Sequence, residues 1–182
     1  MKAAVVVPPA QVPTFADFRD PPEPGPAQIA LRVTAAALSH VTRARAAGTH
    51  YTGGETQPFV AGVDGVGVVD GSARRVFFVQ VDGPFGSMAE RAVVDHDHLL
   101  DVPDGVDDAT AAAIAIPGIS SWAALTERAQ LVRGETVLIH GATGTSGRLA
   151  RLLGGVRVIA TGRHYLTRSF SVSNAPGLLF AH

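Results

Sequence analysis

The sequence predicts a chain of two parts, an all-β domain followed by a partial parallel α/β unit. Three observations support this assignment to the α/β plus β class. Short Val-rich runs bounded by Gly and Pro occupy the chain to about residue 103. Ala-rich segments with helical periodicity follow from about residue 104. A strand-like run, a glycine loop and a second apolar run then succeed one another between Thr136 and Arg163.

The composition excludes several classes of protein. The chain has 182 residues and a formal net charge of -1, which gives no general attraction to nucleic acid or to an anionic membrane. We expect no apolar run that approaches the roughly 20 residues needed to span a bilayer. The N-terminus lacks the apolar region and cleavage site of a signal peptide, so we expect a cytoplasmic protein. Because there is no Cys, the chain has no disulfide and no thiolate metal ligand.

The first part is expected to be a small β-barrel or β-sandwich, because it contains several short strands at close spacing. Turn formers such as PPEPGP and VDGPFG separate these strands. The strand-like runs are AAVVV, IALRVTAAAL, FVAGVDGVGVV, RVFFVQV, MAERAVV and HLLDV. The change of character lies between residues 104 and 118, and we place the end of this domain at residue 110.

Two helices are expected next, in DGVDDATAAAIAI and SSWAALTERAQL. Asp107 and Asp108 stand where acids cap a helix and complement its dipole, which we favour over a pair of acid–base carboxylates. The second helix starts with a Ser cap, and its Trp122, Leu125 and Ala129 have the i, i+3, i+7 spacing of one apolar face.

The loop GATGTSG is predicted to bind the pyrophosphate of a dinucleotide. It follows an apolar strand and precedes a helix, which is the context that such a fingerprint requires. A tight turn lets the backbone approach the pyrophosphate, and the first N–H groups of the helix can then bind it. The alternative is a tight strand–helix turn without a ligand. The predicted binding residues are Gly141, Ala142, Thr143, Gly144, Thr145, Ser146 and Gly147.

The residues at the end of the second strand indicate which dinucleotide the site prefers. A site that prefers NAD carries an acid here for the ribose 2′-hydroxyl, whereas an Arg accommodates the 2′-phosphate of NADP. This chain has Thr161, Gly162 and Arg163 and no acid at this place. These residues favour NADPH over NADH.

Several blocks occur in order between Met1 and Arg163 and together identify a family. They are MKAAVV, LRVTAAALSHVTRARAAG, PFVAGVDGVGVV, GPFGSMAERAVV, AAAIAIPGISSWAAL and GETVLIHGATGTSGRLA. In these blocks the chain resembles the zinc-free quinone oxidoreductase-like branch of the medium-chain dehydrogenase/reductase superfamily, which is alcohol dehydrogenase-like. The resemblance implies a GroES-like catalytic β domain at 1–110 and a partial NADP-binding Rossmann domain at 111–163. It also implies NADPH between the domains, and hydride transfer to a quinone or an enone.

The resemblance implies that zinc takes no part. Zinc-dependent relatives carry a catalytic Cys where this chain has Ser39, and Gly-His-Glu where it has Gly62-Val63-Asp64. Without thiolate or imidazole ligands at these places, we expect no metal site. His96 and His98 are two residues apart, so they would lie on one face of a strand, as a pair of metal ligands can. We favour the alternative that they lie at an exposed strand end.

The residues that would contact the substrate are less well defined by the resemblance. Zinc-free relatives often carry Asn and Asp in the block that here reads LSHVT, so both polar positions differ. Ser39, Thr42 and Tyr51 are the candidate catalytic residues, and Ser120 is a candidate at the nicotinamide end of the cofactor. His40 is either a histidine of the cleft or surface, which we favour, or a general base.

The part after the glycine loop departs from the family. The segment GRLARLLG is shorter by about four residues, which leaves Arg148 to Leu153 as clear helix, about 9 Å long. Residues 164–182 form an atypical tail that would be an edge strand, a cover for the sheet or poorly ordered. A full Rossmann sheet needs on the order of a hundred more residues, so we expect an exposed sheet edge and a homo-oligomer or other self-association. Two functions follow: an NADPH-dependent oxidoreductase, impaired to some degree by truncation, or a non-catalytic remnant that acts as a binding module.

Overall fold

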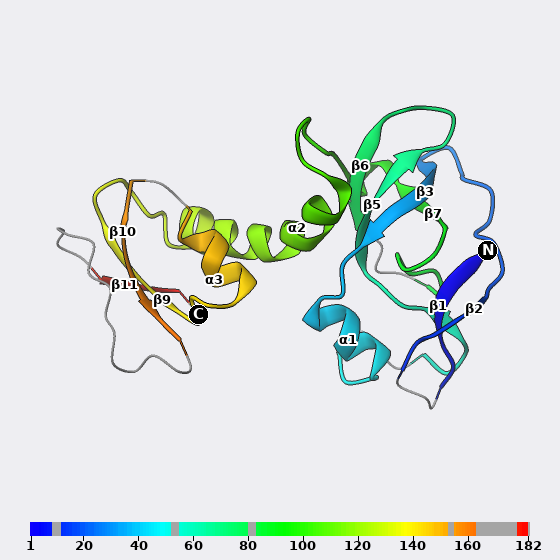
Figure 1. Ribbon diagram of the computed structural model, residues 1–182, viewed down its shortest axis with the longest axis horizontal. Coiled ribbons are helices and arrows are strands. Elements are labelled where there is room, and N and C mark those ends of the chain that lie inside the picture. Colours follow the sequence, from blue (N-terminus) through cyan, green and yellow to red (C-terminus); the bar gives the residue numbers. More distant parts are fainter. Residues whose placement is uncertain (9–11, 52–54, 80–82, 153–154, 163–177, 182) are drawn as a thin grey trace. The chain divides into compact units, whose positions relative to one another are not determined.

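The computed structural model describes residues 1–8, 12–51, 55–79, 83–152, 155–162 and 178–181 (Figure 1). Its contacts divide the chain into two compact units, Met1–Ala113 and Ile114–His182. We call them unit 1 and unit 2 and describe each by itself. The division falls inside the Ala-rich segment, within a helix.

Unit 1 is built on a five-stranded antiparallel sheet in the order β7-β3-β5-β6-β8, which curls in Figure 1. Alternation along these strands places Leu31, Val76 and Phe78 in one core, where each is fully buried. The register of β3 against β5 shifts between Val33 and Ala35, and such a bulge bends a strand. The strands are β3 (Gln28–Ala36), β5 (Asp64–Val69), β6 (Arg75–Val79), β7 (Arg91–Asp95) and β8 (Leu99–Asp101).

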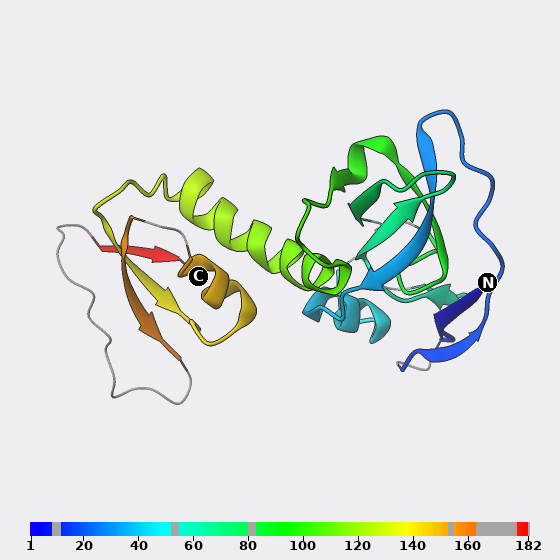
Figure 2. The same cartoon turned by 45° about the horizontal axis from the view of Figure 1, so that its top comes forward.

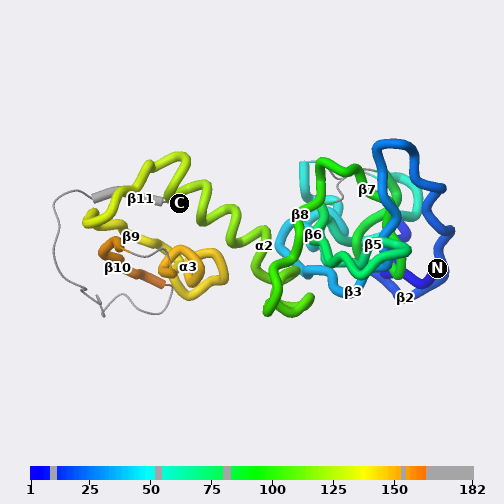
Figure 3. Tube along the Cα trace, turned by 90° about the horizontal axis from the view of Figure 1, so that it is seen from above, coloured from blue at the N-terminus to red at the C-terminus, as the bar shows by residue number. Residues whose placement is uncertain are grey.

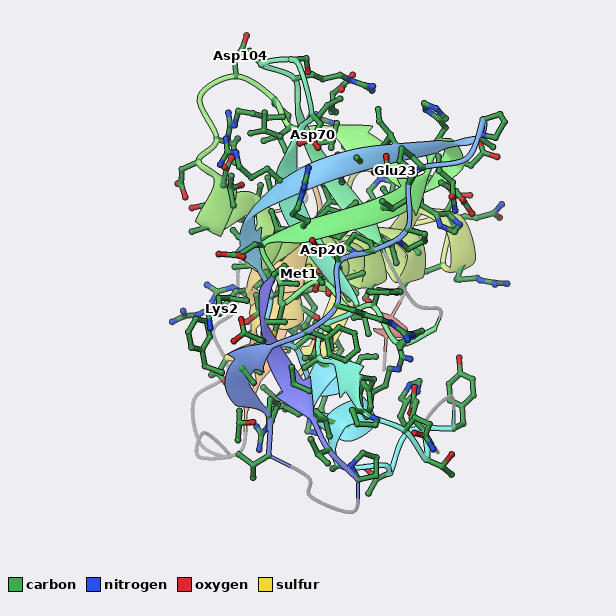
Figure 4. All side chains as sticks on the ribbon, turned by 90° about the vertical axis from the view of Figure 1, so that its right-hand side faces the viewer. Met1, Lys2, Asp20, Glu23, Asp70 and Asp104 are labelled. Atoms are coloured by element: carbon green, nitrogen blue, oxygen red, sulfur yellow. The ribbon has the colours of Figure 1, made fainter. Side chains whose placement is uncertain are left out.

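A three-stranded antiparallel sheet, in the order β2-β1-β4, completes unit 1. Its strands are β1 (Lys2–Val6), β2 (Thr14–Asp17) and β4 (Phe59–Val60). The sequence did not predict β2, because most of its residues are exposed and show no apolar alternation. The α-ammonium group of Met1 donates to the Phe18 carbonyl (3.0 Å) and pairs with Asp20 (2.9 Å). Met1 and Asp20 are labelled in Figure 4. These contacts fix the start of the chain beside the end of β2.

A short helix, α1 (His40–Ala46), follows β3. The backbone N–H of Thr42 donates to the Ser39 hydroxyl oxygen (3.1 Å), which makes Ser39 the N-cap. The expected strand end at His96 and His98 is instead a single 3₁₀ turn, η1 (His96–His98), with exposed side chains.

One continuous helical segment replaces the two predicted helices: α2 (Asp108–Trp122) runs into the π-helical turns of η2 (Ala123–Arg128), as Figure 2 shows. The expected Ser cap is wrong because the Ser120 and Ser121 hydroxyls donate back to carbonyls one turn earlier. The shared apolar face is also wrong, because Trp122 is 52% exposed while Leu125 is buried.

The start of α2 is as predicted. Asp107 accepts hydrogen bonds from the backbone N–H (2.8 Å) and the hydroxyl (2.7 Å) of Thr110. These bonds, the backbone bond first, hold the pKa of the Asp107 carboxyl below its ordinary value. The acid therefore caps the helix.

By length and composition alone, the helical segment Asp108–Arg128 is long and apolar enough to cross a membrane. This corrects the expectation that no apolar run approaches that length. Core helices of soluble proteins meet the same criterion, so it decides nothing about the location of the chain.

Unit 2 holds a three-stranded parallel sheet in the order β10-β9-β11 (Figure 3). The tail supplies its third strand: Leu178 pairs with Thr136 and Ala181 with Ile139, so an edge strand is the alternative that the structure shows. The elements are β9 (Thr136–His140), α3 (Thr145–Ala150), β10 (Arg157–Thr161) and β11 (Leu178–Ala181). The predicted α/β plus β fold is confirmed, with a curled β unit followed by a small parallel α/β unit.

The core of unit 2 is small. Helix α3 is six residues long and starts earlier than the predicted Arg148. Five buried residues form the core: Leu125, Val137, Ile139, Ala142 and Ala150. These residues come from η2, β9, the glycine loop and α3, so the core lies directly beneath the loop.

Candidate functional site

The glycine loop begins where β9 ends. Gly141 has φ 77°, a left-handed conformation that glycine adopts without the steric cost that a Cβ brings. The next residue, Ala142, is buried, and its N–H donates to the carbonyl of Thr161 at the end of β10 (2.9 Å). The loop is therefore tied to the carboxyl end of the second strand.

Gly147 is the residue at which α3 meets this loop most closely. A Cβ at Gly147 would lie 2.5 Å from the Gly141 carbonyl oxygen and 2.6 Å from Ala142 Cα. Both are backbone atoms, so only glycine fits without a shift of the loop. At Gly144 a Cβ would meet nothing nearer than the Gly141 oxygen at 3.5 Å. The close packing that a dinucleotide-binding turn requires is thus located at Gly147.

The first turn of α3 presents free backbone donors. Gly144 is its N-cap and supplies no side-chain hydrogen bond. The N–H groups of Thr145, Ser146 and Gly147 have no acceptor within the helix, as at any helix start. Thr143, Thr145 and Ser146 are exposed, and each adds a hydroxyl. This donor set fits a pyrophosphate.

The end of β10 lies against the loop. The hydroxyl oxygen of Thr161 and Nδ1 of His140 share a hydrogen bond of 2.8 Å. Gly162 is buried, and a Cβ there would approach the Thr143 methyl group to 3.1 Å. The predicted residue Gly162 thus lies beside Thr143, and Thr161 lies beside Ala142. Arg163 lies outside the described residues.

Ser120 is exposed, and its hydroxyl donates to the Ile116 carbonyl (3.0 Å). Its neighbour Ser121 is buried, and its hydroxyl contacts the carbonyl oxygens of Ser146 (2.6 Å) and Pro117 (3.0 Å). Ser121 therefore connects α2 to the first turn of α3. Sequence reasoning missed it, since nothing in SSWAAL indicates a contact with a residue so far along the chain.

The three candidate catalytic residues have different environments. Ser39 caps α1, and its oxygen lies 3.1 Å from the Thr42 hydroxyl. Thr42 is only 2% exposed and its hydroxyl donates to the Ala37 carbonyl (3.3 Å). Tyr51 is 91% exposed, with its ring tilted against that of His50 at a centroid distance of 4.4 Å. Ser39 and Thr42 thus lie together, and Tyr51 stands on the surface.

A cavity of about 620 Å³ runs along α1. Its walls include Leu38, His40, Thr42, Arg43 and Thr49. His40 is exposed, as the favoured prediction of a cleft or surface histidine requires. Three residues of the block LSHVT, Leu38, His40 and Thr42, therefore line a cavity large enough for a small molecule, and Ser39 is not among its lining residues.

Asp64 is the most unusual ionisable group of unit 1. It is 0% exposed, and neither carboxyl oxygen has a hydrogen-bond partner in the described part of the chain. Burial raises the pKa of its carboxyl from 3.8 to about 6. Its backbone carbonyl accepts a hydrogen bond from the N–H of Ala37 (3.5 Å), at the turn that leads to Ser39. Within the described ranges, no three His, Asp or Glu side chains cluster as metal ligands would.

Known proteins resemble both the sequence and the fold. No protein-family model matches the chain. A quinone oxidoreductase of Pseudomonas aeruginosa is 31% identical over 76% of this chain and 45% of its own length. A probable NADPH-dependent quinone reductase of Emericella nidulans is 29% identical over 83% of this chain and 52% of its own. The quinone oxidoreductase of Thermus thermophilus, solved also with NADPH, is 32% identical with a TM-score of 0.76, over 88% of this chain and 52% of that one.

The chain belongs to the medium-chain dehydrogenase/reductase superfamily. The chain spans about half the length of the relatives that it matches. Unit 1 is accordingly the GroES-like part, and the β9–loop–α3–β10 segment is the start of the Rossmann part.

Proposed function

We propose that this chain is part of a zinc-free oxidoreductase that transfers hydride from NADPH to a quinone or an enone. The observation that carries the proposal is the glycine loop, in which Gly147 packs on the backbone of Gly141 and Ala142. Relatives named as quinone oxidoreductases and as an NADPH-dependent quinone reductase support the reaction and the cofactor.

The chain's own groups would hold the cofactor by its anionic parts. The free N–H groups of Thr145, Ser146 and Gly147 bind the pyrophosphate. Arg163, which follows Gly162 in the sequence, binds the 2′-phosphate. Bound NADPH supplies the hydride, and the protein contributes orientation and exclusion of water.

The cavity along α1 would take the substrate. The exposed apolar side chain of Leu38 offers a wall for a planar ring, and His40 offers a hydrogen bond to a carbonyl oxygen. Ser39 and Thr42 position α1 through their hydrogen bonds with each other and with Ala37. Reduction of a quinone adds the hydride and one proton from solvent, which gives a hydroquinone.

The test combines cofactor binding with turnover. NADPH should raise the melting temperature, because a ligand of the folded state stabilises it by RT ln(1 + [L]/Kd). NADPH should also be consumed when menadione is added. Gly147→Val should abolish both effects, whereas the control Gly118→Ala should retain them, because a Cβ at Gly118 would meet nothing nearer than Leu149 Cδ1 at 3.7 Å.

Two results would contradict the proposal. Absence of stabilisation at millimolar NADPH would exclude the cofactor site, and tighter binding of NADH would exclude the role of Arg163. Binding of NADPH without consumption of any quinone or enone would favour the alternative, a non-catalytic binding module.

We also propose that the chain associates with itself through unit 2. Among the described residues, β10 and β11 are the outer strands of the sheet, so each leaves one edge without a strand partner. Open edges pair with other strands. Light scattering after size-exclusion chromatography should give at least twice the mass of 18.8 kDa, and a monomer at high concentration would contradict this.

A further inference from the structure

A second cavity of unit 1 lies on residues that the proposed reaction does not use. It measures about 690 Å³, within the range of small-molecule sites. Its walls include Phe18, Arg19, Glu55, Pro58, Phe59 and Pro84. These residues follow β2, precede or begin β4, or lie in the turn before Gly86, and none belongs to the cavity along α1.

Arg19 is held on this cavity by aromatic rings. Its guanidinium carbon lies 5.8 Å from the centroid of Phe18 and 5.3 Å from that of Phe85. The two rings meet edge to face, with centroids 5.8 Å apart. Cation–π contacts of this kind orient a guanidinium and leave its N–H groups free to donate.

Among the described residues, the cavity carries one cation, Arg19, that no carboxylate neutralises. The two acids on its walls already have cationic partners: Asp17 pairs with Lys2 (2.8 Å), and Glu55 pairs with the buried Arg45 (2.9 Å). Arg19 has no ion pair within the part of the chain that the structure describes. The local charge therefore favours an anionic ligand.

The remaining residues on the cavity walls favour a ligand that also carries an aromatic ring. Pro58 and Pro84 present flat apolar surfaces, and Phe18 presents its ring. A planar guanidinium binds a carboxylate with two parallel hydrogen bonds, which a point-like cation does not. We propose that this cavity binds a small aromatic carboxylate, with the carboxylate on Arg19 and the ring against Phe18 and the prolines.

The test uses the full chain, with benzoate as the anionic probe and benzamide as its neutral match. Benzoate should bind at least tenfold more tightly than benzamide in calorimetric titrations, because only benzoate pairs with Arg19. Arg19→Gln should weaken benzoate binding about tenfold and leave benzamide unchanged. The control Arg128→Gln removes another exposed Arg, in η2, and should change neither affinity.

The position of the probe is read from backbone amide shifts of the isotope-labelled protein. Benzoate should shift the amides of Thr56, Gln57 and Phe59 and leave those of α1 unchanged. The proposal is overturned by equal affinity for benzoate and benzamide, by absence of binding at millimolar benzoate, or by shifts confined to α1. Because no NADPH is present, these results do not depend on the proposed reaction.

Discussion

The two units differ in how local sequence defines them. Unit 1 consists of antiparallel strands whose alternation and turn residues are visible in the sequence, and most of the buried apolar side chains lie there. In unit 2, the central strand β9 pairs in parallel with one strand after the loop and with another from the tail. Stability therefore resides mainly in unit 1, whereas the chemistry of the proposed cofactor site depends on a few contacts around one loop.

Core truncation should separate the two units most strongly. Phe78 in unit 1 and Val137 in unit 2 are both 0% exposed. Phe78→Ala should cost about 4 kcal/mol of unfolding free energy, and Val137→Ala about 2 kcal/mol, because a larger side chain leaves a larger cavity. Urea denaturation followed by circular dichroism measures both. A larger loss at Val137 would reverse the comparison.

The glycine loop offers the next largest effect. Gly147→Ala places a Cβ 2.5 Å from the Gly141 oxygen, so the loop must shift, at a cost of about 3 kcal/mol. Gly144→Ala should change stability by less than about 1 kcal/mol, since its Cβ has ordinary contacts. Fluorescence of Trp122, the only Trp of the chain and part of unit 2, reports the unfolding. Equal losses would show that α3 does not pack as described.

Asp64 makes unit 1 sensitive to pH. Its pKa is about 6 when folded and near 3.8 when unfolded, so the folded state binds more protons between these values. The contribution of Asp64 to the free energy of unfolding is therefore fully present below about pH 4. It falls by up to about 3 kcal/mol as the pH rises through 6. Asp64→Asn should flatten this dependence of the melting temperature and add roughly 2 kcal/mol at pH 8. An unchanged slope would contradict the buried, unpaired carboxylate.

The smallest effect distinguishes a cap from a catalytic group. Ser39→Ala removes the N-cap of α1 and should cost about 1 kcal/mol in a melting experiment. Steady-state kinetics should show kcat nearly unchanged, because the Ser39 oxygen already accepts the Thr42 N–H. A hundredfold fall in kcat without a change in melting temperature would restore Ser39 as a catalytic residue.

Sequence patterns predicted what depends on neighbours along the chain. The strand–loop–helix unit from Thr136 to Ala150 and the cap at Asp107 follow from short-range rules. The place of Leu178 beside Thr136 depends on pairing across most of unit 2, which no local pattern contains. The continuation of α2 through Ser120 depends on whether the Ser120 hydroxyl caps a new helix or donates to the Ile116 carbonyl one turn earlier. The sequence pattern does not distinguish these two possibilities.

The candidate site shows the same division. The glycine spacing located the loop, but the buried state of Thr42 and Asp64 depends on side chains brought together by folding. The exposed position of Tyr51 is likewise set by the fold and not by its neighbours in sequence. The predicted roles of these residues in binding and catalysis stay predictions.

The most direct test of the account is the response of individual backbone amides to NADPH. If unit 2 holds the pyrophosphate, the amides of Thr145, Ser146 and Gly147 should shift and become protected from hydrogen exchange as NADPH is added. In Gly147→Val these changes should be lost, and in the control Gly118→Ala they should remain. Shifts confined to unit 1, or no change at millimolar NADPH, would contradict the claim that this loop is the cofactor site.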